Sequence, residues 1–349
     1  MLKRGLILLM SLCMVIGVAG CKKNPGNLSV ESGADSSLSI IEEPEEFALN
    51  PLTGIKDLDI GKEKNRPVAV MVNNISVAQP VQTGIGKADI VYETEVEGGI
   101  TRLMAVYQDI SKVKKIGTIR SARYAYIDLA MGHNALYVHH GQDRYHAMSH
   151  LNDVGHFVVG SGQGGGRESN GLSTEHTLYA YGKELWSKIK ASGLETKNKS
   201  TENWVKFADE DTEIELDAPA TDISVTFSGS YKTGFKYDSE SKKYIRYSNG
   251  VLRKDYVTGE SESFKNIFVL KTSIYKYPNC TDGKNHKYVD LSSGKGYYIV
   301  NGTSTEIKWS KGSSSNPLKF TDLEGNEITV NPGNTWVCLP NGSNSIVIE

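Results

Sequence analysis

The run Val68-Ala69-Val70-Met71-Val72 sets the strictest limit on the fold of this chain, because its apolar residues are not interrupted by a polar one. A strand with one face in water alternates apolar and polar residues, whereas a strand buried on both faces does not. We therefore expect a strand here with both faces covered. Further strand-like segments lie at residues 88–96, 102–107, 115–120 and 136–138.

Helix-like segments alternate with these strands at residues 125–131, 144–152 and 173–190. In the last segment, Leu178, Leu185 and Ile189 recur at helical spacing. Continuous apolar strands that alternate with helices are typical of a sheet covered on both faces. The pattern predicts a mixed α/β sheet domain with covering helices over residues 65–215.

After residue 216 the helical signal fades and short strand-like segments recur between turn residues. Ser248-Asn249-Gly250, Asn301-Gly302 and Glu324-Gly325-Asn326 favour hairpins. We expect a smaller β-rich domain over residues 216–349. Together the two parts predict an α+β fold.

The N-terminus has the composition of a secretory signal, with basic residues, an apolar stretch over residues 6–18 and small residues before Cys21. The apolar stretch is shorter than the roughly 20 residues that a membrane-spanning helix needs. Val18-Ala19-Gly20-Cys21 resembles the lipobox of bacterial lipoproteins. This resemblance implies removal of residues 1–20 and lipidation of Cys21. The expected partner is then the membrane, through a lipid anchor on the outer face of a bacterial cytoplasmic membrane.

Residues 21–64 are rich in Ser, Gly, Asn, Pro and acids, with Glu42-Glu43-Pro44-Glu45-Glu46 at their centre. Such a composition favours disorder. We expect an acidic tether that holds the domains away from the lipid surface.

The formal net charge of -2 argues against a general nucleic-acid binder, which would carry a basic excess. No nucleic-acid partner is expected. Cys280 and Cys338 are the cysteines of the globular part. In an oxidising compartment they form either one disulfide or two buried free thiols, and the sequence leaves both open.

Arginines flank a predicted helix start in the segment of residues 116–126. A strand is expected to end at Arg120, and Ser121 has the character of an N-cap before Arg123. Free N–H groups at a helix start favour an anion, and guanidinium groups bind phosphate or carboxylate with two hydrogen bonds. The alternative is that these arginines form internal ion pairs with acids such as Asp89, Glu93 or Glu95.

Histidine is concentrated at residues 133–156, which hold six of the chain's eight. His146 and His150 are four residues apart, so on a helix they share one face and suit zinc. A third ligand and a His-Glu-x-x-His pattern are missing, so the sequence defines neither a metal nor a cofactor.

Glycines at 160, 162 and 165 follow a strand-like segment, with Arg167 just beyond them. We expect a mobile loop over a cleft here. Ser173 is a candidate N-cap for the next helix, which would place His176 at the helix start.

Several long motifs resemble the YerB-like bacterial lipoproteins. They lie at residues 66–74, 87–93, 97–102, 116–123 and 137–141, and in the C-terminal half at 305–309, 317–318 and 331–337. The resemblance implies an N-terminal and a C-terminal part whose function is not known. Nine residues match positions typical of the family: Asp89, Glu93, Thr101, Arg102, Arg120, Ser121, Arg123, His139 and His176. His146, His150 and His156 depart from the family pattern, which weakens the zinc hypothesis.

The leading hypothesis is a lipoprotein that binds an anionic envelope ligand, such as a phosphorylated lipid, a teichoic-acid-like polymer or a peptide carboxylate. The expected anion contacts are Arg102, Arg120, Ser121, Arg123 and Arg167. The residues expected to line the cleft or act in catalysis are Asp89, Glu93, His139 and His176.

Two alternatives remain, and the sequence does not decide whether the protein is an enzyme. The first is an envelope phosphotransferase or hydrolase, with an acid as base or metal ligand and arginines that stabilise the transition state. The order of Asp89 and Arg120 along the chain is similar to the order in the LytR-CpsA-Psr phosphotransferases. The second is a structural adaptor in an envelope or sporulation complex, with a protein as partner.

Overall fold

The computed structural model describes residues 47–278 and 280–349. The predicted signal peptide, Cys21 and the tether up to residue 46 lie outside the described residues. The expected tether is too long at its C-terminal end, because residues 47–64 are folded. They contain strands β1 (Ala48–Leu49) and β2 (Lys56–Leu58), which pair with each other. Leu52, which lies between these two strands, is buried in a hydrophobic core. The nearby acidic residues led to a prediction of disorder for a segment that is folded. In the described part of the chain, no helix has the length and apolar composition needed to cross a membrane.

Strands dominate the described residues, and eleven of them form one mixed sheet. Its order is β13 (Ala218–Pro219), β23 (Thr303–Ser310), β22 (Ser293–Val300), β19 (Asn266–Leu270), β26 (Thr335–Leu339), β4 (Ile90–Glu95), β5 (Thr101–Tyr107), β3 (Val68–Asn73), β7 (Leu136–His139) and β8 (His156–Val158), with β24 (Lys319–Thr321) beside β23.

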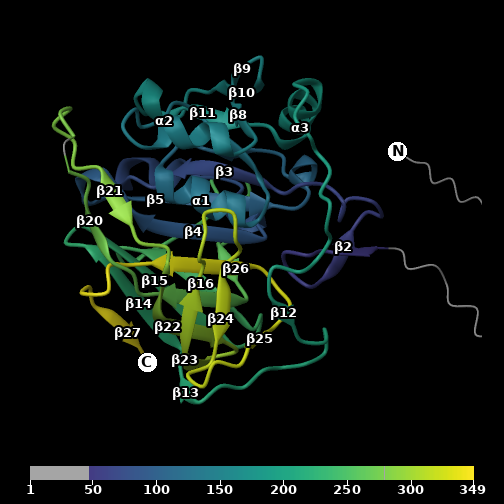
Figure 1. The fold of residues 1–349 in the computed structure, drawn as a ribbon, viewed down its shortest axis with the longest axis vertical. Coiled ribbons are helices and arrows are strands. Elements are labelled where there is room, and N and C mark those ends of the chain that lie inside the picture. The colour runs from purple at the N-terminus through teal and green to yellow at the C-terminus, as the bar shows by residue number, and fades with distance from the viewer. Residues whose placement is uncertain (1–46, 279) are drawn as a thin grey trace, which may run out of the picture. The chain divides into compact units, whose positions relative to one another are not determined.

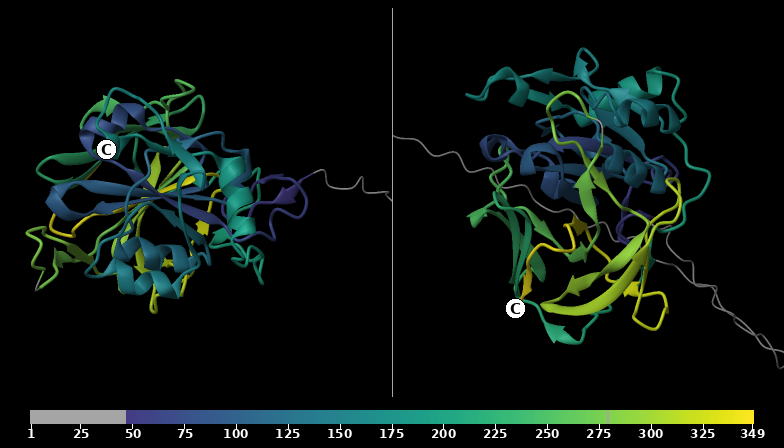
Figure 2. Two further views of the ribbon diagram at one scale, coloured as in Figure 1. Left: turned by 90° about the horizontal axis from the view of Figure 1, so that it is seen from above. Right: turned by 60° about the vertical axis from the view of Figure 1, so that its left-hand side comes forward.

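This sheet joins the N-terminal and C-terminal parts of the chain. Strand β26 lies parallel to β4 and pairs Thr335 with Ile90 and Leu339 with Thr94. Figures 1 and 2 show the yellow end of the chain running beside the blue strands of the first part. The two parts therefore share backbone hydrogen bonds. The domain boundary near residue 216 stays a prediction.

The first part of the sheet is covered on both faces, as the uninterrupted apolar run indicated. Val68, Val70 and Val72 enter one hydrophobic core, and Ala69 and Met71 enter another. The alternation of side chains along a strand explains this division.

The face that carries Val70 packs against a second sheet and against helix α3 (Gly182–Ala191). The second sheet has the order β17 (Val251–Leu252), β16 (Lys243–Ser248), β15 (Tyr231–Asp238), β14 (Asp222–Ser228) and β27 (Ile346–Ile348), with β18 (Ser263–Phe264) beside β16. Every second residue of β14 is buried, so this sheet has one face on the core and the other toward solvent.

The opposite face of the large sheet packs against helices α1 (Tyr124–Gly132) and α2 (Ala147–His150). It also packs against the hairpin of β20 (Ile274–Lys276) and β21 (Lys287–Val289). Strands β12 (Lys206–Phe207) and β25 (Thr329–Val330) form a separate parallel pair. Short 3-10 turns complete the fold: η1 (Ser76–Val81), η2 (Ile85–Lys87), η3 (Glu97–Gly99), η4 (Ile110–Lys112), η5 (Leu151–Asp153) and η6 (Thr174–His176).

The helix expected over residues 173–190 is correct only in its second half. Residues 174–176 form η6, and Leu178–Ala180 form strand β11. Strand β11 pairs with β6 (Ile116–Gly117) and β10 (Gly164–Arg167), and these pairings satisfy its backbone. The spacing of Leu178 and Leu185 correctly predicted that both side chains are buried. Burial alone does not distinguish a helix from a strand.

The glycine-rich segment is not a free loop, because it contributes two strands to a third sheet. Gly160–Ser161 form β9 and Gly164–Arg167 form β10. The order of this sheet is β6, β11, β10 and β9. A Cβ on Gly164 would lie 2.5 Å from the Cα of Leu185, and one on Gly165 would lie 2.4 Å from the carbonyl oxygen of Tyr179. The glycines therefore allow close packing of this strand against α3 and β11.

Two of the predicted hairpin turns are confirmed. Asn249 and Gly250 have φ values of 48° and 78°, and Asn301 and Gly302 have values of 52° and 76°. Positive φ at both central residues is typical of type I′ turns, which asparagine followed by glycine favours.

Candidate functional site

Two of the predicted site residues, Asp89 and Glu93, lie at or in strand β4. Asp89 precedes the strand, Glu93 lies within it and Glu97 follows it. Arg102 on the next strand pairs with Thr94, near the end of β4. At about 3.4 Å per residue, Asp89 lies roughly 17 Å from this arginine along the sheet. The phosphotransferase hypothesis requires Asp89 and the arginines to lie in one site, and the structure does not bring them together.

Arg102 and Arg123 share the carboxylate of Glu97. Arg123 donates from Nε to Oε2 at 2.8 Å and from Nη2 to Oε1. Arg102 places Nη2 3.5 Å from the same carboxylate, and its Nη1 donates to the carbonyl of Ser121 at 2.5 Å. Burial lowers the pKa of each arginine to about 10, so both remain charged at neutral pH. Their ion-pair partner is thus Glu97, and not one of the acids considered from the sequence.

Helix α1 lies where the helix-like segment of residues 125–131 was expected, but Ser121 is not its N-cap. Its first residue is Tyr124, and Arg123 occupies the N-cap position without a side-chain cap hydrogen bond. Ser121, the predicted N-cap, precedes the helix, because the backbone around it pairs with other segments. Arg120 donates its N–H to the carbonyl of Met71, and Ala122 donates to Gly141.

Arg120 and Arg167 gather around the 3-10 turn η6. Arg120 donates to the backbone carbonyl of Glu175 at 2.9 Å and to its carboxylate at 3.3 Å. Arg167 donates to the carbonyl of Thr174. His176 accepts from the amide of Asn73 with its Nδ1 at 2.9 Å. Ser173 makes no side-chain cap, so the predicted helix start at His176 is wrong.

His139 is fully buried beside His156. Its Nδ1 donates to the carbonyl of Gly141 at 2.7 Å, and its Nε2 lies 3.2 Å from Nδ1 of His156. Burial lowers the pKa of His139 to about 4, so the ring is neutral at physiological pH. The arrangement fixes the ring inside the sheet.

His146 and His150 do not converge on one point. His146 stacks on the ring of Tyr277 and lies 3.8 Å from the sulfur of Cys280, whereas His150 pairs with Asp153 at 3.3 Å. In the described part of the chain, no group of three or more His, Cys, Asp or Glu residues is arranged to hold a metal ion. Cys280 and Cys338 are both free thiols.

Glu93 belongs to a buried polar network between the two large sheets. Its carboxylate accepts hydrogen bonds from Asn74 at 3.0 Å, Thr101 at 2.8 Å and Thr233 at 2.9 Å. Burial raises the pKa of Glu93, and the charge of nearby Arg246 opposes this rise. Because Thr233 and Arg246 come from the second sheet, the network holds the two sheets together.

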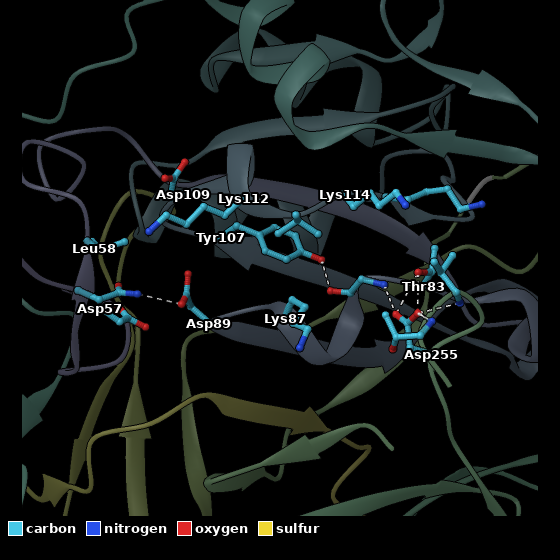
Figure 3. A pocket seen from close by; sticks show the side chains of 16 residues that line it. Asp57, Leu58, Thr83, Lys87, Asp89, Tyr107, Asp109, Lys112, Lys114 and Asp255 are labelled. Carbon is cyan, nitrogen blue, oxygen red and sulfur yellow. Dashed lines mark hydrogen bonds between the residues drawn. The ribbon is translucent and has the colours of Figure 1, made fainter. Parts of the chain in front are cut away.

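Asp89 lines an open cavity of about 340 Å³, which is the site of greatest chemical interest (Figure 3). The lining residues come from the folded N-terminal segment, the η1–β4 region, the end of β5, the segment around η4 and a loop after β17. They are Asn50, Asp57, Leu58, Thr83, Gly84, Lys87, Asp89, Tyr107, Asp109, Lys112, Val113, Lys114, Lys115, Asp255, Val257 and Thr258.

The carboxylate of Asp89 has neutral hydrogen-bond donors. Oδ1 accepts from the side-chain amide of Asn50 at 2.9 Å, and Oδ2 accepts from the backbone N–H of Gln108 at 2.6 Å. Burial raises the pKa of Asp89 to about 7, and the charges of Asp57 and Asp109 add to this rise. Among the described residues it forms no ion pair. Asp89 is therefore a half-buried acid that titrates near neutral pH.

The lysines of the cavity differ in their pairing. Lys87 pairs with Glu260 at 2.9 Å, Lys112 with Asp59 at 3.0 Å and Lys115 with Glu168 at 2.9 Å. Lys114 is exposed and has no ion pair within the described residues. Among the described residues, Lys114 is thus the lysine at the margin of this cavity that forms no ion pair.

Asp255 closes the other end of the cavity. Its carboxylate accepts hydrogen bonds from Thr83 at 2.9 Å, from the N–H of Gly84 at 2.6 Å and from the N–H of Val257 at 2.8 Å. Tyr107 donates to the carbonyl of Gly84 at 2.9 Å. These bonds connect a loop of the C-terminal part to the N-terminal part and form one wall of the cavity.

A second cavity, of about 310 Å³, lies beside Arg123. It is lined by Ser121, Arg123, Gln142, Asp143, Arg144, Asp282, Lys284 and His286. Of the predicted anion contacts, Ser121 and Arg123 lie here, whereas Arg102, Arg120 and Arg167 line neither this cavity nor the one beside Asp89. Glu93, His139 and His176 also line neither cavity.

Sequence reasoning missed most residues around Asp89. Asn50 and Asp57 lie in the segment assigned to the tether, and Asp255 lies in a loop more than 160 positions away. The segment Phe47-Ala48-Leu49 is apolar and gave a local signal that the tether had ended. No local sequence pattern connects Asp255 with Asp89. A carboxylate that accepts hydrogen bonds from backbone N–H groups, as Asp255 does, leaves no periodic pattern in the sequence.

Comparisons with known proteins agree with this arrangement. A family model described as the N-terminal domain of a protein of unknown function, DUF3048, matches residues 52–195, and its C-terminal counterpart matches residues 223–337. The chain belongs to the DUF3048 family. It is 30% identical to the putative lipoprotein YerB of Bacillus subtilis (strain 168) over 301 residues, which cover 82% of this chain and 84% of YerB. The crystal structure of YerB from B. subtilis superimposes with a TM-score of 0.73 at 26% identity and covers 85% of this chain and 98% of that one. The predicted resemblance to the YerB-like lipoproteins is confirmed.

Proposed function

We propose that this DUF3048 protein is a lipid-anchored binding protein that holds a small molecule in the cavity beside Asp89. The observation that carries the proposal is a half-buried carboxylate that opens onto a cavity and forms no ion pair with the described residues. A buried ionised carboxylate without a cationic partner destabilises a fold. Groups of this kind, with a strongly shifted pKa in a concave site, concentrate at functional sites.

The dimensions of the cavity support the same proposal. Its volume of about 340 Å³ lies at the lower end of the range of small-molecule sites, which begins near 300 Å³. Leu58, Tyr107 and Val113 supply apolar surface, and Asn50 and Asp89 supply a few fixed polar groups. This combination is typical of ligand sites that recognise one end of a molecule and bury the rest.

A ligand screen tests the proposal. Thermal unfolding of the full-length protein is recorded with a library of envelope-related small molecules, and hits are repeated with Asp89→Asn and with Glu240→Gln. Glu240 is an exposed acid that does not line the cavity, so its substitution is the control. A ligand that stabilises the wild type and Glu240→Gln but not Asp89→Asn supports the proposal. If every stabilising ligand also stabilises Asp89→Asn, the Asp89 cavity is not the binding site.

The lipid anchor is the second element of this proposal. The relative YerB is named a putative lipoprotein, and Cys21 follows a lipobox-like segment in this chain. Two acyl chains on one residue give stable membrane attachment. Palmitate labelling of cells that express Cys21→Ser provides the test. We expect the variant to lose both the label and the membrane fraction, and retention of either contradicts the anchor.

A second candidate function is anion binding at the cavity beside Arg123. The observation in its favour is that Arg144 and Lys284 line this cavity, are exposed and form no ion pair with other described residues. Arg123 itself is occupied by Glu97, so the exposed pair supplies the free charge. Inorganic pyrophosphate is the probe, and binding is compared between the wild type and an Arg144→Gln/Lys284→Gln double variant. Equal binding by both proteins removes this candidate.

Two further assays with the same variants address the remaining alternatives, a phosphotransferase or hydrolase and a structural adaptor. Release of phosphate from a polyprenyl diphosphate, dependent on Asp89 or Glu93, would favour an enzyme. Binding without turnover favours the binding protein. A stable complex with an envelope protein that survives Asp89→Asn and the double variant would favour the adaptor.

A further inference from the structure

We infer that the cavity beside Asp89 takes a small zwitterion, with a protonated amine at the end near Asp57 and Asp89 and a carboxylate at the end near Lys114. This inference rests on the proposed function and names the ligand class for the same site. Three features of the cavity carry it: the charge at one end, the apolar wall between the ends and the free cation at the other end.

The first end of the cavity carries a negative excess. Figure 3 shows Asp57 and Asp89 together with Asp109 and Lys112 at this end. Lys62 neutralises Asp109 at 3.2 Å, and Lys112 is held by Asp59 at 3.0 Å. Within the described residues, neither Asp57 nor Asp89 forms an ion pair. Burial raises the pKa of Asp57, and the charge of Lys112 opposes this rise.

A carboxylate of this kind favours a cation from outside the protein. Each oxygen of Asp89 accepts a single hydrogen bond from the described residues, at 2.9 Å and 2.6 Å, and a carboxylate oxygen has two lone pairs. An ammonium group therefore finds an acceptor at Asp89 and a second charge at Asp57. An ammonium group is preferred to a metal ion at this place, because no metal-ligand arrangement exists in the described residues.

The middle of the cavity is apolar, and its far end holds Lys114 together with the hydrogen-bonded carboxylate of Asp255. Leu58 and Val113 are buried lining residues, and the ring of Tyr107 lies between the two ends in Figure 3. Lys114 lies away from Asp57 and Asp89 in the same view. Because Asp255 is held by its own hydrogen bonds, Lys114 is the free charge that meets a carboxylate.

Matched probes separate the parts of this inference. Calorimetric titration of the full-length protein uses 4-aminobutanoate, 6-aminohexanoate and 8-aminooctanoate, with hexylamine and hexanoate as single-charge controls. We expect at least one amino acid to bind the wild type and Glu240→Gln, a substitution of an exposed acid outside the cavity, equally. Its affinity falls by at least about tenfold in Asp89→Asn, which corresponds to about 1.4 kcal/mol. Hexylamine binds more weakly than 6-aminohexanoate, and hexanoate shows no binding that depends on Asp89.

The lysine end has its own control. In Lys114→Gln, the amino acid is expected to bind no better than the alkylamine, while hexylamine is unaffected. Equal binding of the amino acid by wild type and Lys114→Gln contradicts the carboxylate end, and Asp89-dependent binding of hexanoate contradicts the amine end.

Proton release gives an independent readout. Asp89 faces Asp57 and Asn50 from the N-terminal segment, Asp109 from the end of β5, and Lys87 and Lys112 from the adjoining turns. An ammonium at this place favours ionised Asp89, so binding at pH 6 releases part of one proton and binding at pH 9 releases none. Titrations in buffers of different ionisation enthalpy measure this number, and Asp89→Asn abolishes it.

The two proposals fail in different ways. If no probe binds at about 10 mM, far above an ordinary micromolar dissociation constant, or if the library yields an Asp89-dependent ligand without an amine, the zwitterion is wrong. In the latter case the binding function stands. If no ligand of any class depends on Asp89, the proposed function fails as well.

Discussion

Replacing Asp89 by asparagine changes the pH dependence of stability, and the structure gives the size of the change. The folded protein holds this carboxyl at a pKa of about 7, raised from 3.8 mainly by burial. A raised carboxyl pKa means that the folded state binds the proton more tightly than the unfolded state. The stability contributed by protonated Asp89 is therefore complete below pH 3.8, is lost as the pH rises toward 7, and is constant above pH 7.

At about 1.4 kcal/mol per pKa unit, the loss between these limits is at most about 4 kcal/mol. Asparagine cannot ionise, so Asp89→Asn avoids this loss. Its amide nitrogen cannot accept the hydrogen bond that Asn50 or Gln108 donates, which costs about 1 to 3 kcal/mol at every pH. We expect the variant to be less stable than the wild type at pH 4 and more stable at pH 8, by about 1 to 3 kcal/mol in each case.

The measurement is urea denaturation of the full-length protein followed by tryptophan fluorescence at several pH values between 4 and 8. Contributions from other groups cancel in the difference between variant and wild type. Asp59→Asn is the control, because Asp59 is exposed and its surface ion pair contributes less than about 1 kcal/mol. If the difference in the free energy of unfolding between Asp89→Asn and the wild type stays constant from pH 4 to pH 8, the raised pKa of Asp89 is refuted. The description of Asp89 as an acid without a compensating cation in the cavity is then refuted as well.

Other substitutions test the packing around the site by the same denaturation assay. Glu97→Gln removes the carboxylate that two buried arginines share and should lower the free energy of unfolding by about 3 kcal/mol, whereas Glu175→Gln, whose side chain is 61% exposed, should cost less than about 1 kcal/mol. Equal losses would contradict the difference in burial. Arg246→Met leaves Glu262 buried without its 2.6 Å ion-pair partner and should cost about 3 to 5 kcal/mol, so a neutral effect would show that the pair is dispensable. Gly182→Ala should destabilise by more than about 1 kcal/mol although alanine favours helix, because its Cβ would lie 2.1 Å from the carbonyl oxygen of Ile110; a stabilised variant would contradict that packing.

Local patterns in the sequence predicted the elements that depend on near neighbours. The run at 68–72 is a strand buried on both faces, because burial on both faces requires apolar residues at successive positions. Asn249-Gly250 and Asn301-Gly302 form the expected turns, because the left-handed conformation has a strong residue preference. The family resemblance also came from contiguous motifs.

The sequence predicted the candidate site less well. It identified Asp89 and the arginine-rich segment, but it grouped them into one site. It also extended the tether over Asn50 and Asp57, because nearby acids and small residues outweighed a short apolar segment. The partners of the arginines, Glu97 and Glu175, were not among the acids considered.

The sequence by itself determined which segments are buried, where the hairpins turn and which family the chain belongs to. The tertiary structure decided that β26 lies beside β4, that Leu178 belongs to a strand and that Asp89 opens into a cavity away from the arginines. The reason is physical: side-chain periodicity records burial within one segment. Strand pairing, ion pairing and cavity formation depend on residues that meet after the chain has folded back on itself.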